Sequence, residues 1–565
     1  MALQLFSQHN TTVQISTPND VLHLTILLTA NQVNEVVLPT DIYYSSGSDA
    51  YGNKGIKIVS QDSIQVIAMH YRVNFSDASL VLPVQDLDTS YVGTAFYDMT
   101  PVYKGVSEIV IVSTQDHNII SITPSDTLTS GRPAGQTYSV YLDAGQTYQI
   151  QSFSDLSGTK VRANQKIAVF GGVATGYVFS GKLSGANNHL WDETFPTSLW
   201  STHYIAIPFL NEGNSPCHVV ANEDSTLIYV NCNLTAILMK GEAYTFFITY
   251  PSLVESSKPV ALSEMINSLS ATPDKYGDPS FLNLLPANYF SKIEGFNCSN
   301  SINGAGSYYF TEHFANVIVP ADAVDDFIID GINISKDSFH FFNDDTRYAY
   351  AQLQLKPGYH IFQCSKGFNA AIYGKGYYDA YSFTAGFQTI KPDSAIQIGN
   401  ANNCLGNPTD FNYISTDSLS GFAWNFGDHT TSTKQNTSHI YSKPGNYIAY
   451  AKGYTKDGCL RTYSEEITIE DCNQGCSQCN SDFCTVSMYP NPGHVINIDA
   501  DQAKNISFLQ VTDALGRVVY SMNNNDGKNL PTSIDLSLLK TAIYFLTVVC
   551  DGGRSTEKIL IQGEY

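Results

Sequence analysis

The chain has 565 residues, which at roughly 150 residues per domain predicts three or four domains. Apolar residues make up 43% of it and charged residues 15%, and 52 Asp and Glu against 30 Lys and Arg give a net charge of −22. This balance excludes nucleic acid or an anionic membrane as the main partner, because both bind clustered Lys and Arg. The 36 Tyr and 29 Phe exclude a disordered chain.

Short runs of β-branched and aromatic residues, separated by Gly, Asn, Asp and Pro, recur from the start of the chain. Such runs predict strands and turns, and clear examples are residues 109–112, 138–142, 167–170, 227–230 and 244–249. No long stretch has the apolar period of a helix, and none is apolar enough to span a membrane. The sequence therefore predicts an all-β protein without direct membrane insertion.

Residues 1–390 contain a weak internal repeat, in which a strand led by Gly is followed by a second strand after a turn. The paired segments are 145–150 with 164–170, 241–246 with 257–262, 358–362 with 367–373, and a weaker first copy at 55–59 with 62–67. A spacing of about 100 residues predicts domain-sized, β-sandwich-like units, four in tandem. A single large β domain is the alternative interpretation.

Residues from about 93 to 386 carry four groups of motifs. These are VSTQD at 112–116, LDAGQTY at 142–148, GTKV at 158–161, and YGKGY at 373–377 with YSFTAG at 381–386. The segment resembles the IgGFc-binding N-terminal region of mucus-associated animal proteins and bacterial surface proteins. The resemblance implies a ligand-binding region, although a shared fold does not imply a shared ligand.

A second pattern lies in residues 391–471. Trp424 and Phe426 alternate onto one face of a strand, as the core of a sandwich requires. The other motif residues are Gly427, Asp428, Tyr441, Pro444, Gly445 and Tyr447. The pattern resembles a PKD domain and implies an immunoglobulin-like sandwich. His429 stands where that family has Gly, which is expected to alter the turn and not the fold.

Residues 486–565 resemble the type A C-terminal sorting domain of the type IX secretion system. The motif residues are Tyr489, Pro490, Asn491, Pro492, Asp513, Gly516, Arg517, Tyr544 and Lys558. The resemblance implies a Bacteroidota bacterium, binding to the outer-membrane translocon and a sortase-like peptidase, and a final place on the outer cell surface or outside the cell. The N-terminus lacks the basic start and apolar core of a secretory signal, so the numbering is expected to begin after a removed signal peptide.

Eleven cysteines favour an oxidising compartment. We expect three disulfides outside the linker, namely Cys404–Cys459 in the PKD-like domain, Cys217–Cys232 across a hairpin, and Cys298–Cys364. A linker at 472–485 carries four more cysteines, Cys472, Cys476, Cys479 and Cys484. Their spacing lacks the paired CxxC of zinc sites, so disulfides are favoured there as well.

Catalytic and metal-binding motifs are missing from the sequence: the His residues are scattered, and no HExxH, GxSxG or P-loop is found. Two groups of residues are weaker candidates for a site. The acidic group Asp322, Asp325, Asp326 and Asp330 is a candidate for calcium, with a solvated turn favoured because the alternating-ligand pattern is missing. The aromatic group Tyr377, Tyr378, Tyr381 and Phe383 is a candidate sugar-stacking platform, with cross-strand packing favoured. No cofactor is expected.

Together these features predict a non-enzymatic, adhesin-like protein that is secreted or displayed on the cell surface. Its ligand is expected to be an extracellular glycoprotein or glycan. Two alternatives remain: a structural subunit of a surface fibre or gliding apparatus, and an unrecognised glycan-active enzyme. The latter stays open because the paired carboxylates of glycosidases are identified only by their geometry.

Overall fold

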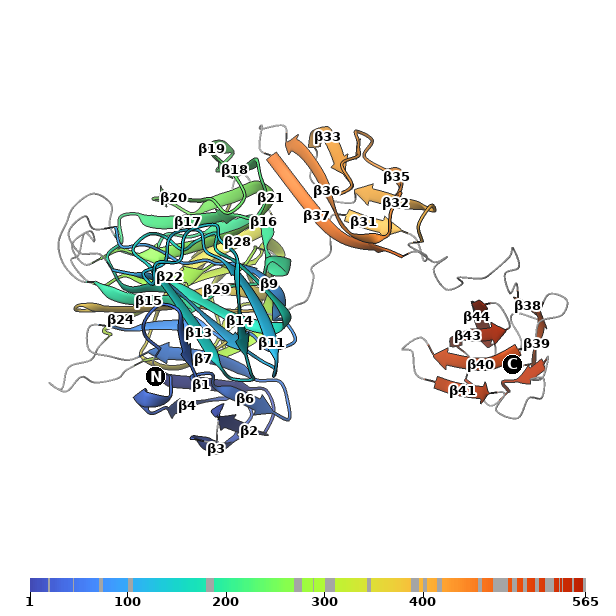
Figure 1. The fold of residues 1–565 in the computed structure, drawn as a ribbon, viewed down its shortest axis with the longest axis horizontal. Coiled ribbons are helices and arrows are strands. Elements are labelled where there is room, and N and C mark those ends of the chain that lie inside the picture. Colours follow the sequence, from blue (N-terminus) through green and yellow to red (C-terminus); the bar gives the residue numbers. More distant parts are fainter. Residues whose placement is uncertain are drawn as a thin grey trace. The chain divides into compact units, whose positions relative to one another are not determined.

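The structure is a computed structural model, shown in Figure 1. It describes residues 1–18, 21–43, 45–70, 75–99, 105–178, 187–268, 277–287, 289–299, 310–342, 347–387, 396–399, 404–413, 419–455, 460–470, 486–489, 495–500, 506–513, 518–523, 533–537, 539–540, 542–550 and 553–561. Strands dominate and the helices are single 3-10 turns, so the predicted all-β class is confirmed. Among the described residues, no helix has the length and apolar character that crossing a membrane requires.

Packing divides the chain into two compact units. The first comprises Met1–Gly399, Asp410–His439 and Ile448–Glu466. The second comprises Asn400–Thr409, Ile440–Tyr447 and Ile467–Tyr565.

The part of the first unit up to Gly399 contains four successive groups of strands, here called repeats 1 to 4. Repeat 1 contains β1 (Ala2–Ser7), β2 (Thr11–Ser16), β3 (His23–Leu28), β4 (Gln32–Val37), η2 (Thr40–Ile42), β5 (Ala50–Gly52), β6 (Lys57–Ser60), β7 (Gln65–His70) and β8 (Asp77–Leu80). Repeat 2 contains β9 (Asp88–Val92), β10 (Ser107–Ser113), β11 (Asn118–Thr123), β12 (Tyr138–Leu142), β13 (Thr147–Ser152), β14 (Lys160–Gly176) and β15 (Asn188–Glu193).

Repeats 3 and 4 follow with the same kinds of element. Repeat 3 contains η3 (Thr197–Leu199), β16 (Ser201–Ala206), β17 (Ser215–Ala221), β18 (Thr226–Val230), β19 (Asn233–Leu238), β20 (Ala243–Ile248), β21 (Ser252–Ile266) and β22 (Ser280–Asn283). Repeat 4 contains β23 (Ser291–Cys298), β24 (Glu312–Pro320), η4 (Ala321–Ala323), β25 (Ile328–Ile329), β26 (Ile332–Asn333), η5 (Lys336–Ser338), β27 (His340–Phe341), β28 (Tyr348–Leu355), β29 (Gly358–Gly376) and β30 (Asp379–Ala385).

The four repeats share one antiparallel strand order. It reads β12-β11-β14-β10-β13 in repeat 2, β19-β18-β21-β17-β20 in repeat 3 and β26-β25-β29-β24-β28 in repeat 4. In repeat 2 the first part of the long central strand β14 pairs with β9 and β11, and its second part pairs with β10 and β15. In repeat 1 the long strand is interrupted, so β6 pairs with β2 while β7 pairs with β1 and β8. In repeats 2 to 4 each long strand therefore pairs with four other strands, two along its first part and two along its second part.

Local sequence explains these strands. The segment Ser107–Ser113 buries every second residue, which is the alternation of a strand with one face on the core. Gly145 and Gly241 hold φ of +76° and +85° in the turns before β13 and β20. Only glycine adopts this backbone without strain, which explains the Gly-led element of the sequence repeat.

The structure corrects the alignment of that sequence repeat. The second elements at 164–170, 257–262 and 367–373 all lie in the second parts of the long strands β14, β21 and β29. The Gly-led element at 358–362 begins β29 itself, whereas its expected equivalents at 145–150 and 241–246 belong to β13 and β20. The strand of repeat 4 that matches β13 by topology is β28, and the segment at 55–59 likewise belongs to the interrupted long strand of repeat 1.

The last strands of the four repeats, β8, β15, β22 and β30, lie against one another in a closed cycle. Asp77 on β8 is fully buried there and accepts hydrogen bonds from all three other repeats. The backbone donors are Trp191 N (3.3 Å), Phe281 N (3.2 Å) and Ser382 N (3.4 Å), and the Ser280 hydroxyl also donates to Asp77 at 2.6 Å. Hydrogen bonds from backbone N–H groups to the Asp77 carboxylate thus join repeats whose last strands do not form a continuous ladder.

Apolar packing also crosses the repeat boundaries. Repeat 2 has a core of its own that includes Ile109 and Val169. The core of repeat 4 takes in Ile67 and Met69 of repeat 1, and the core of repeat 3 takes in Tyr373 of repeat 4. Figure 1 shows the strands from blue to yellow interleaved in one body. The four repeats therefore share hydrophobic cores across their boundaries and pack as one body, not as four independently packed domains.

The PKD-like segment contains two antiparallel strand groups, with orders β31-β32-β35 and β34-β33-β36-β37. Its strands are β31 (Ile396–Gly399), β32 (Pro408–Tyr413), β33 (Leu419–Asn425), β34 (Thr431–Ser432), β35 (Thr437–Ile440), β36 (Gly445–Thr455) and β37 (Leu460–Ile469). Trp424 and Phe426 are 1% and 2% exposed, and both rings pack against Phe411. The predicted core face of this strand is therefore present.

The C-terminal segment also has two strand groups, with orders β38-β39-β42 and β41-β40-β43-β44. The strands are β38 (Val486–Tyr489), β39 (Val495–Ala500), β40 (Ile506–Asp513), β41 (Val518–Asn523), β42 (Ser533–Asp535), β43 (Ala542–Cys550) and β44 (Gly553–Ile561). Its core contains Leu509, Leu546 and Ile559. Apolar side chains from both strand groups meet there, as in a small sandwich.

Candidate binding surface

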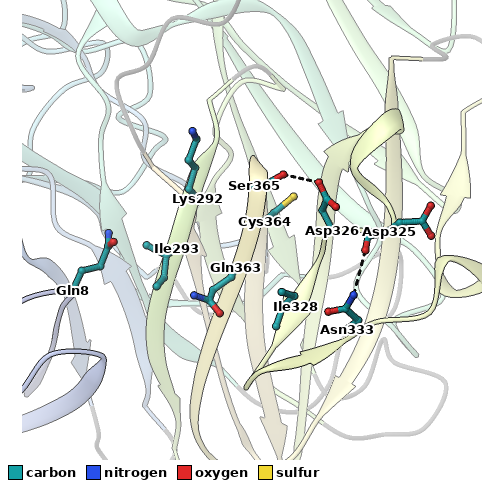
Figure 2. Close-up of a pocket in the computed structure, with 10 residues that line it drawn as sticks. All are labelled: Gln8, Lys292, Ile293, Asp325, Asp326, Ile328, Asn333, Gln363, Cys364 and Ser365. Atoms are coloured by element: carbon teal, nitrogen blue, oxygen red, sulfur yellow. Dashed lines mark hydrogen bonds between the residues drawn. The ribbon is translucent and has the colours of Figure 1, made fainter.

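A depression of about 420 Å³ lies on repeat 4 and reaches Gln8 of repeat 1 (Figure 2). Its floor is a row of side chains across adjacent strands. Gln363 on β29 stands opposite Ile293 on β23 and Ile328 on β25, and Ile328 stands opposite Asn333 on β26. Residues paired across antiparallel strands share one face of the sheet, so ladder register places these four side chains side by side.

Acidic and polar groups form one side of the depression. Ser365 Oγ donates to Asp326 Oδ2 at 2.5 Å, and Asn333 Nδ2 donates to the Asp325 carbonyl oxygen at 3.4 Å. These bonds fix the acidic loop against the sheet. Lys292 is the cation among the lining residues, as Figure 2 shows.

Cys364 also lines the depression but is only 2% exposed. Burial raises the pKa of its thiol, which keeps it protonated and unreactive at neutral pH. Ser365 has the Asp326 carboxylate and no imidazole as its partner, so the described lining residues contain no activated nucleophile. Two carboxylates and three amides (of Gln8, Asn333 and Gln363) suit hydrogen bonding to a hydroxyl-rich or amide-rich ligand.

The acidic stretch that was a calcium candidate has other partners. Asp322 pairs with Lys366 at 2.6 Å. Asp330 contacts the His360 ring at 2.7 Å and accepts from Ile361 N at 2.8 Å. In the described part of the chain, no three or more His, Cys, Asp and Glu side chains come together as a metal site.

The aromatic platform does not form. Tyr381 and Phe383 are fully buried in the core of repeat 4, whereas Tyr377 is 64% exposed. Tyr377 and Tyr378 occupy the turn between β29 and β30, and only their two rings pack together there (4.2 Å between centroids). Every residue of β30 is buried, and the face that carries Tyr381 and Phe383 packs into the core of repeat 4.

Two expected disulfides are wrong. Cys217, Cys298 and Cys364 are buried free thiols. Cys217 lies on β17, and β21 separates β17 from β18, so Cys217 and Cys232 do not face each other across a hairpin. Cys298 pairs with Gly358, six positions before Cys364 on β29, which is about 20 Å along a strand and beyond the reach of a disulfide.

Cys232 and Cys404 each take part in a disulfide bond. Cys459 and the linker cysteines Cys472, Cys476, Cys479 and Cys484 lie outside the described residues. The pairing Cys404–Cys459 therefore stays a prediction.

The PKD motif residues hold a turn together. Asp428 accepts from Thr430 N at 3.0 Å and contacts the His439 ring at 2.7 Å. Hydrogen bonds from these partners lower the pKa of Asp428 against the opposing effect of burial. His429 has φ +72°, a left-handed backbone that glycine adopts without strain and that His adopts less readily, so the expected alteration of this turn stays a prediction.

Other motif residues of the two C-terminal segments are placed in part. Tyr441 is buried against Tyr447, whose hydroxyl donates to the Lys443 carbonyl at 2.8 Å. Asp513 stands opposite Tyr544, and Lys558 stands opposite Phe545. Pro490, Asn491, Pro492, Gly516 and Arg517 lie outside the described residues.

The depression itself was largely missed from sequence. Asp325 and Asp326 stood out as an acidic stretch, but Gln8, Asn333 and Gln363 belong to no motif. Strand register alone brings them together, and one sequence carries no signal of it. Fold and surface together define a class: an all-β protein of tandem sandwich-like repeats, with an exposed polar depression and no catalytic constellation among the described lining residues.

Three family models match the chain. The model described as "IgGFc binding protein" matches residues 77–374, the "PKD domain" model 391–482, and the "Secretion system C-terminal sorting domain" model 487–562. The first covers more than half of the sequence, and the chain belongs to the IgGFc-binding protein family. All three expected resemblances are confirmed. The matched domains are binding, PKD and sorting domains, none of them catalytic, and the sorting domain implies export by the type IX secretion system.

A human relative described as "IgGFc-binding protein" is 26% identical over 255 residues, which is 43% of this chain and 4% of that protein. Among solved structures, fibronectin(III)-like modules of Clostridium thermocellum CbhA show 14% identity over 30% of this chain and 94% of that one, with a TM-score of 0.15. Dimeric latent PorU from Porphyromonas gingivalis shows 11% identity over 54% of this chain and 32% of that one, with a TM-score of 0.12.

Proposed function

We propose that the chain is a non-enzymatic, adhesin-like protein whose N-terminal repeats bind an extracellular glycan or glycoprotein. The observation that carries this proposal is a row in which apolar and amide side chains alternate across the sheet, in the order Ile293, Gln363, Ile328 and Asn333. Amides next to exposed apolar groups match the mixed hydroxyl and C–H surface of a sugar. Backbone ladders hold the row, so little ordering is needed on binding.

The remaining segments serve delivery and spacing in this proposal. Residues 391–471 form a spacer, 472–485 a cysteine-rich linker, and 486–565 the sorting domain that binds the outer-membrane translocon and a sortase-like peptidase. The mature protein would then act on the outer cell surface or outside the cell. Family membership and the sorting-domain match support this arrangement.

The binding proposal is tested with the full chain on a panel of glycans, mucins, immunoglobulins and matrix proteins. Gln363→Ala is expected to weaken binding about two- to tenfold, since a lost hydrogen bond contributes about 0.5–1.5 kcal/mol. Gln61→Ala, at an exposed position of repeat 1, is the control and should bind as wild type. Equal loss in both variants would place the ligand elsewhere. The absence of any saturable partner would favour a structural role, and turnover of a glycan would favour an enzyme.

Export is tested separately. Deleting residues 486–565 is expected to hold the protein in the periplasm of its producing cell, because the sorting domain is the translocation signal in this proposal. Fractionation and surface labelling measure the outcome. Normal surface display of the truncated chain would contradict the sorting role and leave the binding proposal unaffected.

A further inference from the structure

Two carboxyl groups are enclosed where repeats 3 and 4 meet at the central cycle of strands. The segment leading into β22 runs beside the hairpin that opens β30. At one end, Gly277 N donates to the Gly376 carbonyl at 2.8 Å, and Gly277 forms an isolated parallel β-bridge with Tyr377. At the other end, the Ser280 and Ser382 hydroxyls are 2.5 Å apart. Asp278 and Asp379 lie in the short stretches between these two ties.

Asp278 is fully buried, and neither of its carboxyl oxygens receives a hydrogen bond from a described residue. A buried carboxyl without a partner is strongly unfavourable, and in native proteins it commonly indicates a bound ion or water. Burial, with the negative charges of Asp379 and Asp77, raises the pKa of Asp278 well above its ordinary value. The bridge between Gly277 and Tyr377 and the contact between Ser280 and Ser382 place Asp278 and Asp379 on adjacent stretches of chain.

The charged groups around the pair are already engaged. The Lys375 side chain runs close beside Gly277. Its ammonium group binds the Glu212 carboxylate at 2.7 Å, and both of these side chains are fully buried. Asp77 accepts from Ser280 Oγ at 2.6 Å and from Phe281 N at 3.2 Å. Lys375, the cationic side chain next to this segment among the described residues, is therefore paired with Glu212.

We propose that Asp278 and Asp379 bind a calcium ion at the junction of repeats 3 and 4. A divalent cation would supply the partner that the buried Asp278 carboxylate lacks among the described residues, with Asp379 as a second oxygen ligand. Since no three His, Cys, Asp or Glu side chains of the described residues form a metal site, the other ligands are carbonyl, hydroxyl and water oxygens. Calcium accepts six to eight such oxygens, whereas zinc and copper favour nitrogen and sulfur. The ion would lock the last strands of two repeats together.

The experiment uses the full chain after chelator treatment and titrates calcium chloride by calorimetry and thermal unfolding. We expect one calcium-sensitive site per chain, in the range of about 10⁻⁴–10⁻³ M typical of extracellular modules, and a higher unfolding temperature with calcium. Asp278→Asn, which keeps the shape and removes the charge, should lose both effects. Asp325→Asn, in the exposed acidic stretch, is the matched control and should keep both.

A second measurement, terbium luminescence of the wild-type chain, does not depend on whether the variants fold. Tyr377 and Tyr378 lie directly before Asp379, so terbium at this site should emit on tyrosine excitation and be displaced by calcium. Wild type without calcium stabilisation up to about 10 mM, well above that range, would overturn the proposal. So would calcium binding that survives Asp278→Asn, or terbium emission that is absent in wild type. A stability that responds to pH and not to calcium would instead identify a shared proton, which also overturns it.

Discussion

The contact between Asp77 and the other three repeats predicts that a single side chain controls the stability of the whole N-terminal region. Asp77→Ala removes the acceptor of the buried N–H groups of Ala78, Trp191, Phe281 and Ser382. A buried donor without an acceptor costs about 1–3 kcal/mol, so four of them give roughly 4–12 kcal/mol. Burial raises the pKa of Asp77, so removing the carboxylate also relieves a desolvation penalty. We therefore expect a loss near the lower bound, about 4 kcal/mol in the free energy of unfolding.

Guanidinium unfolding of the full chain, followed by tryptophan fluorescence, measures this loss. Trp191 and Trp200 lie in the four-repeat region, so most of the signal reports on it. Asp62→Ala, at an exposed turn, is the control and should change stability by no more than about 0.5 kcal/mol. The reasoning is refuted if Asp77→Ala unfolds at the same denaturant concentration as wild type. It is also refuted if only repeat 1 unfolds early, since the hydrogen bonds would then not couple the repeats.

Two further predictions concern the PKD-like core and pH. Trp424→Ala should destabilise the PKD-like segment by about 3–5 kcal/mol and leave the four-repeat transition in place; simultaneous melting of both transitions would contradict this. Burial raises the pKa of Asp192 to about 7 and that of Glu294 to about 8, so the folded state holds protons that the unfolded state releases. Stability should therefore fall as pH rises from about 7 to 8 and level off above that range. His313, whose pKa burial lowers to about 4, is neutral in the folded state, and an unfolded imidazole with the ordinary pKa of about 6.5 is also mostly neutral between pH 7 and 8. Denaturation midpoints that stay constant or rise with pH in that window would disprove the assignment.

The sequence by itself determined the strands and the three family segments. The alternation in Ser107–Ser113 and the pair Trp424 and Phe426 specify which face of a strand is buried, because side chains alternate across a strand whatever its neighbours. The motifs of the sorting segment likewise follow one another within a short stretch. These signals are local, and a single sequence carries local signals in full.

Only the tertiary structure decided how distant strands meet. Gln363 faces Ile293 because of ladder register, Asp77 reaches three other repeats because the last strands close a cycle, and Cys217 misses Cys232 because β21 lies between their strands. A shift of one residue in register would turn each of these side chains to the opposite face. Register and closure arise from packing summed over hundreds of residues, so the surface, the buried carboxyl pair and the disulfides could not be derived from spacing along the chain.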